Sequence, residues 1–195
     1  MLEILTGVLQ GLTEFLPISS SGHLVIISSL SSELDLNTND IAFLHIGTLF
    51  SIVFFYRKRI FEIFEDLDTF VFYFKIILAG IIPAVLIGLL TPIQNIIDES
   101  PNLILITGAS YLIFSLLLIF SGKINNSEAL NIRDITVSQA FVIGIAQSIA
   151  LLPGVSRSGV TLLTAIYLGV KKADAIYYSL LLGTVSYTHL RAHET

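Results

Sequence analysis

The chain has 195 residues, of which 54% are hydrophobic and only 13% are charged, and its mean hydropathy is +0.85. Soluble domains carry about 25% charged residues, so this composition excludes an ordinary soluble domain and predicts an integral membrane protein. The absence of cysteine excludes disulfides and thiolate metal sites. The net charge of −5 says little, because the position of charges relative to the membrane matters more than their sum. We expect no nucleic-acid partner.

The chain begins with two short apolar segments that flank a polar break. Segments 1–16 and 19–30 are each shorter than the roughly 20 residues that a membrane span needs, and Pro17 lies between them. Broken backbone is tolerated at membrane depth only inside protein or beside a wet cavity. The pattern therefore predicts a re-entrant helical hairpin. The alternative is a single span with a proline kink.

A second copy of this break occurs later in the chain. Five residues lie 137 positions after their counterparts in the first copy, so that Gln10, Ser19, Ser20, Ser21 and Gly22 match Gln147, Ser156, Arg157, Ser158 and Gly159. Segments 135–152 and 156–168 are predicted to form the second broken hairpin.

Three spans are predicted between the hairpins, at 40–56, 69–90 and 102–120, with a short interfacial helix at 60–68. Another span is predicted to begin near Ala173. The Arg-Lys-Arg cluster at 57–59 places that end in the cytoplasm. The first hairpin would then enter from outside and the second from inside.

The predicted fold is therefore an all-α integral membrane protein, an inverted-topology repeat with two re-entrant helical hairpins and several transmembrane helices. Such repeats bring their polar breaks together near the bilayer midplane. Residues 1–184 would form one polytopic membrane domain, with repeat one at about 1–90 and an incomplete repeat two from about 135. We expect 185–195 to be a non-native tail, because it turns polar within an expected span and resembles the translation of a DNA-library adapter.

The polar residues of the two breaks have the chemistry of a phosphate site. An arginine inside a bilayer is energetically costly, so Arg157 is a candidate functional residue. Its guanidinium could bind phosphate through two parallel hydrogen bonds. The hydroxyls predicted to bind phosphate with it are those of Ser19, Ser156, Ser158 and Thr161. Serines beside small residues also often serve only to pack helices together.

Glu14 would act as a general acid or base, or as a metal ligand together with Gln10, for Mg²⁺ or Ca²⁺. Either Ser20 or His23 is the candidate nucleophile, and the other could be its base. The alternative for Glu14 is a purely structural ion pair with Arg157. We interpret His45 as a satisfied interior residue rather than a catalyst.

The segments Glu-Phe-Leu-Pro-Ile-Ser-Ser-Ser-Gly-His at 14–23 and Pro-Gly-Val-Ser-Arg-Ser-Gly-Val-Thr at 153–161 resemble the two signature motifs of the undecaprenyl-diphosphate phosphatase family, also called bacitracin resistance proteins. The resemblance covers 1–184. It implies a metal-dependent, multi-pass enzyme of the bacterial cytoplasmic (inner) membrane whose site opens to the periplasm. The site it implies consists of Glu14, Ser20, His23, Ser156, Arg157 and Thr161.

The implied activity removes the terminal phosphate of undecaprenyl diphosphate, which recycles the lipid carrier for peptidoglycan synthesis and confers bacitracin resistance. The expected partners are this polyprenyl diphosphate and membrane lipids, and a homodimer is an open alternative. The rival function is a polyprenyl-phosphate flippase or transporter, because inverted repeats with broken helices are also transporter architecture. A phosphatase needs a nucleophile, an acid or base and a charge clamp together, and this sequence contains all three.

Overall fold

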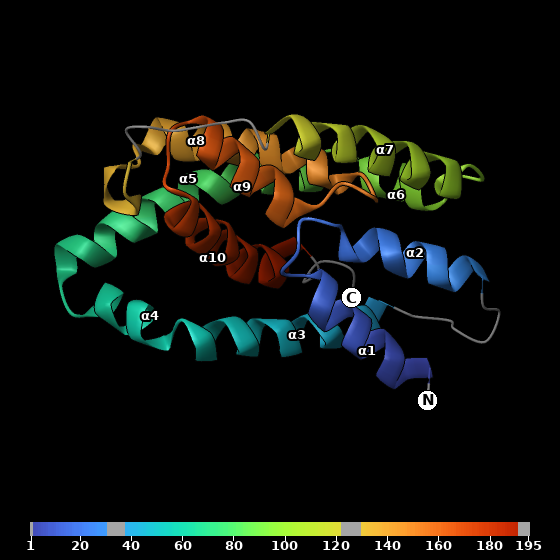
Figure 1. Cartoon of the computed structure of the whole chain (residues 1–195), viewed down its shortest axis with the longest axis horizontal. Helices are drawn as coiled ribbons and strands as arrows, with labels where there is room; N and C mark the ends of the chain where they lie inside the picture. Colours follow the sequence, from blue (N-terminus) through green and yellow to red (C-terminus); the bar gives the residue numbers. More distant parts are fainter. Residues whose placement is uncertain (1, 31–37, 122–129, 191–195) are drawn as a thin grey trace.

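A computed structural model describes residues 2–30, 38–121 and 130–190, with side chains for 4–30, 43–121 and 130–184. In chain order its helices are α1 (Leu2–Thr13), α2 (Ser20–Leu30), α3 (Thr38–Phe55), α4 (Arg57–Phe64), α5 (Leu67–Leu90), α6 (Ile93–Asp98), α7 (Leu103–Ser121), η1 (Ile132–Asp134), α8 (Val137–Gln147), η2 (Ser148–Leu151), α9 (Arg157–Tyr167) and α10 (Lys172–Leu190). Figure 1 shows α5, α7, α8 and α9 lying along one another on one side, with α1 and α3 on the other.

The predicted all-α architecture is confirmed. Within the described residues, α5 and α7 are long and apolar enough to cross a membrane, with mean hydropathies of 2.4 and 2.5. Several boundaries differ from expectation. Helix α1 ends at Thr13 rather than at residue 16, so the chain leaves the helix before Pro17. The helix predicted from residue 60 begins at Arg57, and the expected loop 91–101 contains the short helix α6, which follows the extended residue Thr91 and begins after Pro92.

The two hairpins share the same local structure as well as the same sequence pattern. At the first break, the Ser19 Oγ accepts a hydrogen bond from the Gly22 N–H at 3.3 Å. At the second, the Ser156 Oγ accepts one from the Gly159 N–H at 3.1 Å. In each copy the helix begins at the residue after this capping serine, as expected when a side-chain oxygen satisfies a free N–H of the first turn.

The main core lies where the second hairpin packs on α5 and α10. Ile76, Ala140, Ile143, Ala165 and Leu182 are fully buried there. Many other large apolar side chains of the described helices face outward, including those on the outer faces of α1, α3 and α7. An outward apolar surface of this extent suits a lipid environment, since the largest exposed apolar patch of a soluble monomer is usually a few hundred Å².

Helix α7 contacts both hairpins through two aromatic rings one turn apart. A Cβ added at Gly22 would lie 2.7 Å from the ring of Tyr111, and one added at Gly159 would lie 2.5 Å from the ring of Phe114. Neither position therefore has room for a larger residue. These two close contacts fix the starts of α2 and α9 against the same helix, and so fix them relative to each other.

Helix α10 continues to Leu190, six residues into the segment 185–195 that the sequence predicts to be non-native. Its backbone is helical there. The origin of that segment, and the division of the chain into two repeats within one domain, stay predictions.

Candidate active site

The centre of the candidate site is an ion pair that joins the two hairpins. Glu14 follows the last residue of α1, and its N–H still donates to the Gln10 carbonyl at 3.0 Å. Arg157 is the first residue of α9, and its Nη2 donates to the Glu14 Oε1 at 2.9 Å. The two side chains are only 5% and 19% exposed. The structure therefore brings together two residues 143 positions apart, in the ion pair that the sequence analysis gives as the alternative role of Glu14.

The second oxygen of the same carboxylate accepts two further hydrogen bonds. The Ser20 Oγ donates to Glu14 Oε2 at 2.5 Å, and the Gln10 Nε2 donates to it at 2.9 Å. A hydroxyl bonded this closely to a carboxylate is in position to lose its proton to that carboxylate. Arg157 holds its place through a second bond as well, from Nη1 to the Gly183 carbonyl of α10 at 3.2 Å.

His45 of α3 lies at the edge of this cluster rather than apart from it. Its Nε2 is 3.2 Å from the Gln10 Nε2 and 3.8 Å from the Glu14 Oε2. An amide nitrogen can only donate, so the neutral His45 ring accepts at Nε2. The side-chain NH₂ of Gln10 thus bonds both Glu14 and His45 and orients the carboxylate.

The side chain of His23 points toward α7 and not toward Ser20. Its Nδ1 lies 2.8 Å from the Ser19 carbonyl oxygen and 2.7 Å from the Tyr111 hydroxyl, which also donates to that carbonyl at 2.8 Å. A carbonyl oxygen only accepts, so the proton of the neutral ring is on Nδ1 and the lone pair is on Nε2. Among the described contacts no hydrogen bond joins Ser20 to His23, so the structure gives Ser20 the base Glu14.

The backbone beneath His23 is unusual. Ser19 has φ +57°, in the left-handed region that residues other than glycine seldom adopt. Tyr111 and His23 both bond its carbonyl, which holds this conformation in place. Strained backbone of this kind persists where surrounding contacts fix it, and it often occurs at functional sites.

The hydroxyls of the second hairpin connect the two breaks. The Ser156 Oγ and Ser158 Oγ reach the Leu16 carbonyl at 3.5 and 3.3 Å and lie 3.1 Å from each other. Thr161 behaves differently. It is buried, its Oγ1 donates to the Arg157 carbonyl at 2.9 Å, and it lies 2.6 Å from the Ser179 Oγ of α10. The predicted phosphate-binding roles of these residues and of Ser19 stay predictions.

The oxygens present fit a hard cation only in part. The Gln10 Oε1 is buried and has no hydrogen-bond partner among the described residues. It is the kind of neutral oxygen that Mg²⁺ and Ca²⁺ accept beside a carboxylate. No group of three or more histidine, cysteine or acidic side chains gathers within the described part of the chain. Gln10 and Glu14 could therefore supply two metal ligands but not a complete coordination sphere.

Sequence reasoning missed Tyr111 and Gly183, and it placed His45 outside the site. Tyr111 carried one usable signal. A tyrosine in an apolar span needs a partner for its hydroxyl, and a search for such partners would have pointed to the polar breaks. Gly183 contributes its backbone carbonyl, and a Cβ there would lie 3.1 Å from the Arg157 Nη2, so only the glycine itself was a signal in the sequence.

The chain matches the family described as "Bacitracin resistance protein BacA" over residues 3–193. Similar curated proteins carry the name undecaprenyl-diphosphatase. One from Methanococcus maripaludis (strain C5) is 36% identical over 190 residues, covering 94% of this chain and 74% of that protein. One from Thermosipho africanus is 38% identical over 188 residues, covering 94% and 73%. One from Christiangramia forsetii is 39% identical over 188 residues, covering 92% and 69%. Coverage of this extent, together with the outward apolar helices, means that the chain is a membrane protein of the bacitracin resistance protein BacA family.

Proposed function

We propose that the chain hydrolyses undecaprenyl diphosphate to undecaprenyl phosphate and inorganic phosphate, which returns the lipid carrier to cell-wall synthesis and confers resistance to bacitracin. The observation that carries this proposal is one carboxylate shared by a hydroxyl and a guanidinium. Glu14 accepts from Ser20 at 2.5 Å and from Arg157 at 2.9 Å. The name shared by the similar proteins supports it.

In the reaction that this geometry favours, the Ser20 Oγ attacks the terminal phosphorus while Glu14 takes its proton. The bond between that phosphorus and the bridging oxygen breaks, and undecaprenyl phosphate leaves. Glu14 releases that proton to solvent and then deprotonates the water that attacks the phosphoserine. The bond between phosphorus and the Ser20 Oγ breaks, Glu14 returns its proton to Ser20, and phosphate leaves. Arg157 exchanges its bond to Glu14 for a bidentate bond to the phosphate oxygens, where it stabilises the charge that develops during transfer.

His23 is suited to the leaving group. The neutral ring has its lone pair on Nε2, so that atom can take up a proton from water and give it to the bridging oxygen as the bond breaks. The same lone pair could attack phosphorus directly, which makes His23 the second candidate nucleophile. The contact between Ser20 and Glu14 favours Ser20, since a hydroxyl needs a base to react and this one has it.

A Mg²⁺ or Ca²⁺ ion would neutralise charge on the diphosphate. Glu14 and Gln10 would contribute one or two oxygens, and the phosphates would supply others, as is usual where Mg²⁺ binds with a phosphorylated substrate. We further propose that the chain lies in the bacterial cytoplasmic membrane with its site open to the periplasm, where the lipid diphosphate is its partner.

A polyprenyl-phosphate flippase is the alternative, but it needs the site for binding alone and gives the Ser20–Glu14 contact no task. The test is phosphate release from undecaprenyl diphosphate by the purified chain, with and without Mg²⁺ or Ca²⁺. Ser20→Ala should abolish release, whereas Ser28→Ala, an exposed serine on the same helix, should not. Folded wild-type chain that binds the lipid but releases no phosphate with either cation would refute hydrolysis and favour the flippase.

A further inference from the structure

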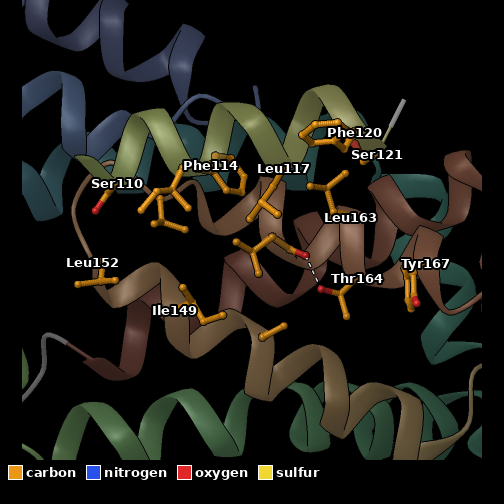
Figure 2. Close-up of a pocket in the computed structure, with 14 residues that line it drawn as sticks. Ser110, Phe114, Leu117, Phe120, Ser121, Ile149, Leu152, Leu163, Thr164 and Tyr167 are labelled. Carbon is orange, nitrogen blue, oxygen red and sulfur yellow. Dashed lines mark hydrogen bonds between the residues drawn. The ribbon is translucent and has the colours of Figure 1, made fainter. Parts of the chain in front are cut away.

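An apolar pocket of about 550 Å³ lies between α7, α9 and the end of the second hairpin's first arm, α8 and η2. Figure 2 shows its lining side chains pointing toward one another from these helices. Phe114, Val155 and Val160 form a buried floor, whereas Leu117 and Ile149 stand half-exposed at the rim. The volume falls within the roughly 300–1,000 Å³ that is typical of ligand pockets.

The pocket begins beside the candidate site. Val155 directly precedes the capping residue Ser156, and Ser110 is the neighbour of Tyr111, which bonds the first hairpin. From Ser110 the lining extends along α7 to Ser121, a distance of about 16 Å at 1.5 Å per helical residue. Figure 2 shows the labelled side chains spread along this direction.

The lining identifies the chemistry of the occupant. It contains no charged residue, and its polar groups are hydroxyls. One of them, the Thr164 Oγ1, is already bonded to the Val160 carbonyl at 2.8 Å. A hydrocarbon chain suits such a wall, because each methylene removed from water is favourable and no polar group is left unpaired. Arg157 and the N-terminus of α9 at the near end suit an anionic head.

We propose that this pocket holds the first part of the isoprenoid chain of the diphosphate substrate, the part nearest the phosphates. The assignment rests on the proposed function and deepens it. The head would lie at the N-terminus of α9 and the chain would follow the same helix between α7 and α8. Because the pocket is about 16 Å long, it covers only a fraction of an undecaprenyl chain. The remainder lies in the bilayer.

A narrowed pocket tests this assignment. Leu117→Trp places a bulky ring at the rim, and Leu116→Trp is its matched control, since the two leucines are neighbours on α7 with 56% and 54% exposure and only Leu117 lines the pocket. Phosphate release would be measured with undecaprenyl diphosphate and with dimethylallyl diphosphate, whose five-carbon chain barely enters the pocket. For Leu117→Trp, KM for the long substrate should rise about tenfold, the loss expected when about two methylenes are no longer buried. KM for the short substrate should stay unchanged, and Leu116→Trp should alter neither.

An equal change for both substrates, or no change for either, overturns the assignment. Absence of release by wild-type chain from both substrates is instead a failure of the proposed function. In that case crosslinking still decides the question. A polyprenyl diphosphate with a photoreactive group on its first isoprene unit should label residues of α7 and α9 that line the pocket. Labelling elsewhere, or pocket labelling by a photoreactive phospholipid that excess polyprenyl diphosphate does not displace, overturns the assignment.

Discussion

Tyr111→Phe tests whether the orientation of His23 matters, because it removes one oxygen and keeps the ring that packs on Gly22. That oxygen donates to the Ser19 carbonyl at 2.8 Å and lies 2.7 Å from the His23 Nδ1. A neutral hydrogen bond contributes about 0.5–1.5 kcal/mol. If this hydrogen bond stabilises the transition state by holding the imidazole in place, its loss should lower kcat about 2- to 13-fold. About 1.4 kcal/mol corresponds to a tenfold change in rate.

The assay is steady-state phosphate release from undecaprenyl diphosphate, with thermal unfolding measured in parallel. We expect kcat to fall while KM changes little, because the hydroxyl bonds the protein and not the phosphates. Tyr56→Phe is the control. Its ring packs against Tyr177 at the far end of α3, and it should keep wild-type kcat. A folded Tyr111→Phe chain with unchanged kcat would refute the reasoning and leave catalysis to Ser20 and Glu14 without His23.

Three other predictions follow from the ion pair and the close contact at α9. Arg157→Ala should abolish phosphate release and, by leaving Glu14 buried without its partner, lower stability by about 3–5 kcal/mol; near-normal release would count against the charge clamp. Glu14→Gln should be far more damaging to release than Gln10→Glu, because only Glu14 can take the Ser20 proton, and equal losses in the same assay would argue against Glu14 as the base. Gly159→Ala should lower the unfolding free energy by about 1–3 kcal/mol, since its new Cβ would lie 2.5 Å from a buried ring, whereas Gly108→Ala, with nothing within 4 Å, should not; equal thermal stability of the two variants would contradict this.

The sequence predicted the broken hairpins well, because their signals are local. Pro17 and the serines that follow it lie between two apolar segments too short to span a membrane, and the pattern 137 residues later repeats the break, the capping serine and the first helical residue. Helix boundaries were less predictable. Helix α6 forms in an expected loop, where Pro92 begins a helix too short for apolar periodicity to reveal.

The partners within the site were predicted only where charge dictated them. A buried carboxylate and a buried guanidinium attract each other wherever the fold permits, which is why residue types alone offered the Glu14–Arg157 contact as an alternative to phosphate binding by Arg157. The pairing of Ser20 with His23 did not form, because the rotation of α2 about its axis turns the hydroxyl to Glu14 and the imidazole to Tyr111. That rotation is set by the packing of α2 against α7, which no local pattern encodes.

The distance in sequence between Glu14 and Arg157 has a consequence for biosynthesis. The carboxylate reaches the membrane 143 residues before its partner has been made. At about 5–20 residues per second, that interval lasts roughly 7–30 s. An unpaired carboxylate is costly in lipid, so during this time the first hairpin should either remain at the membrane surface or carry Glu14 in its protonated form. The emergence of the second hairpin from the ribosome would then allow the first to insert with its carboxylate paired, which couples the insertion of the two hairpins.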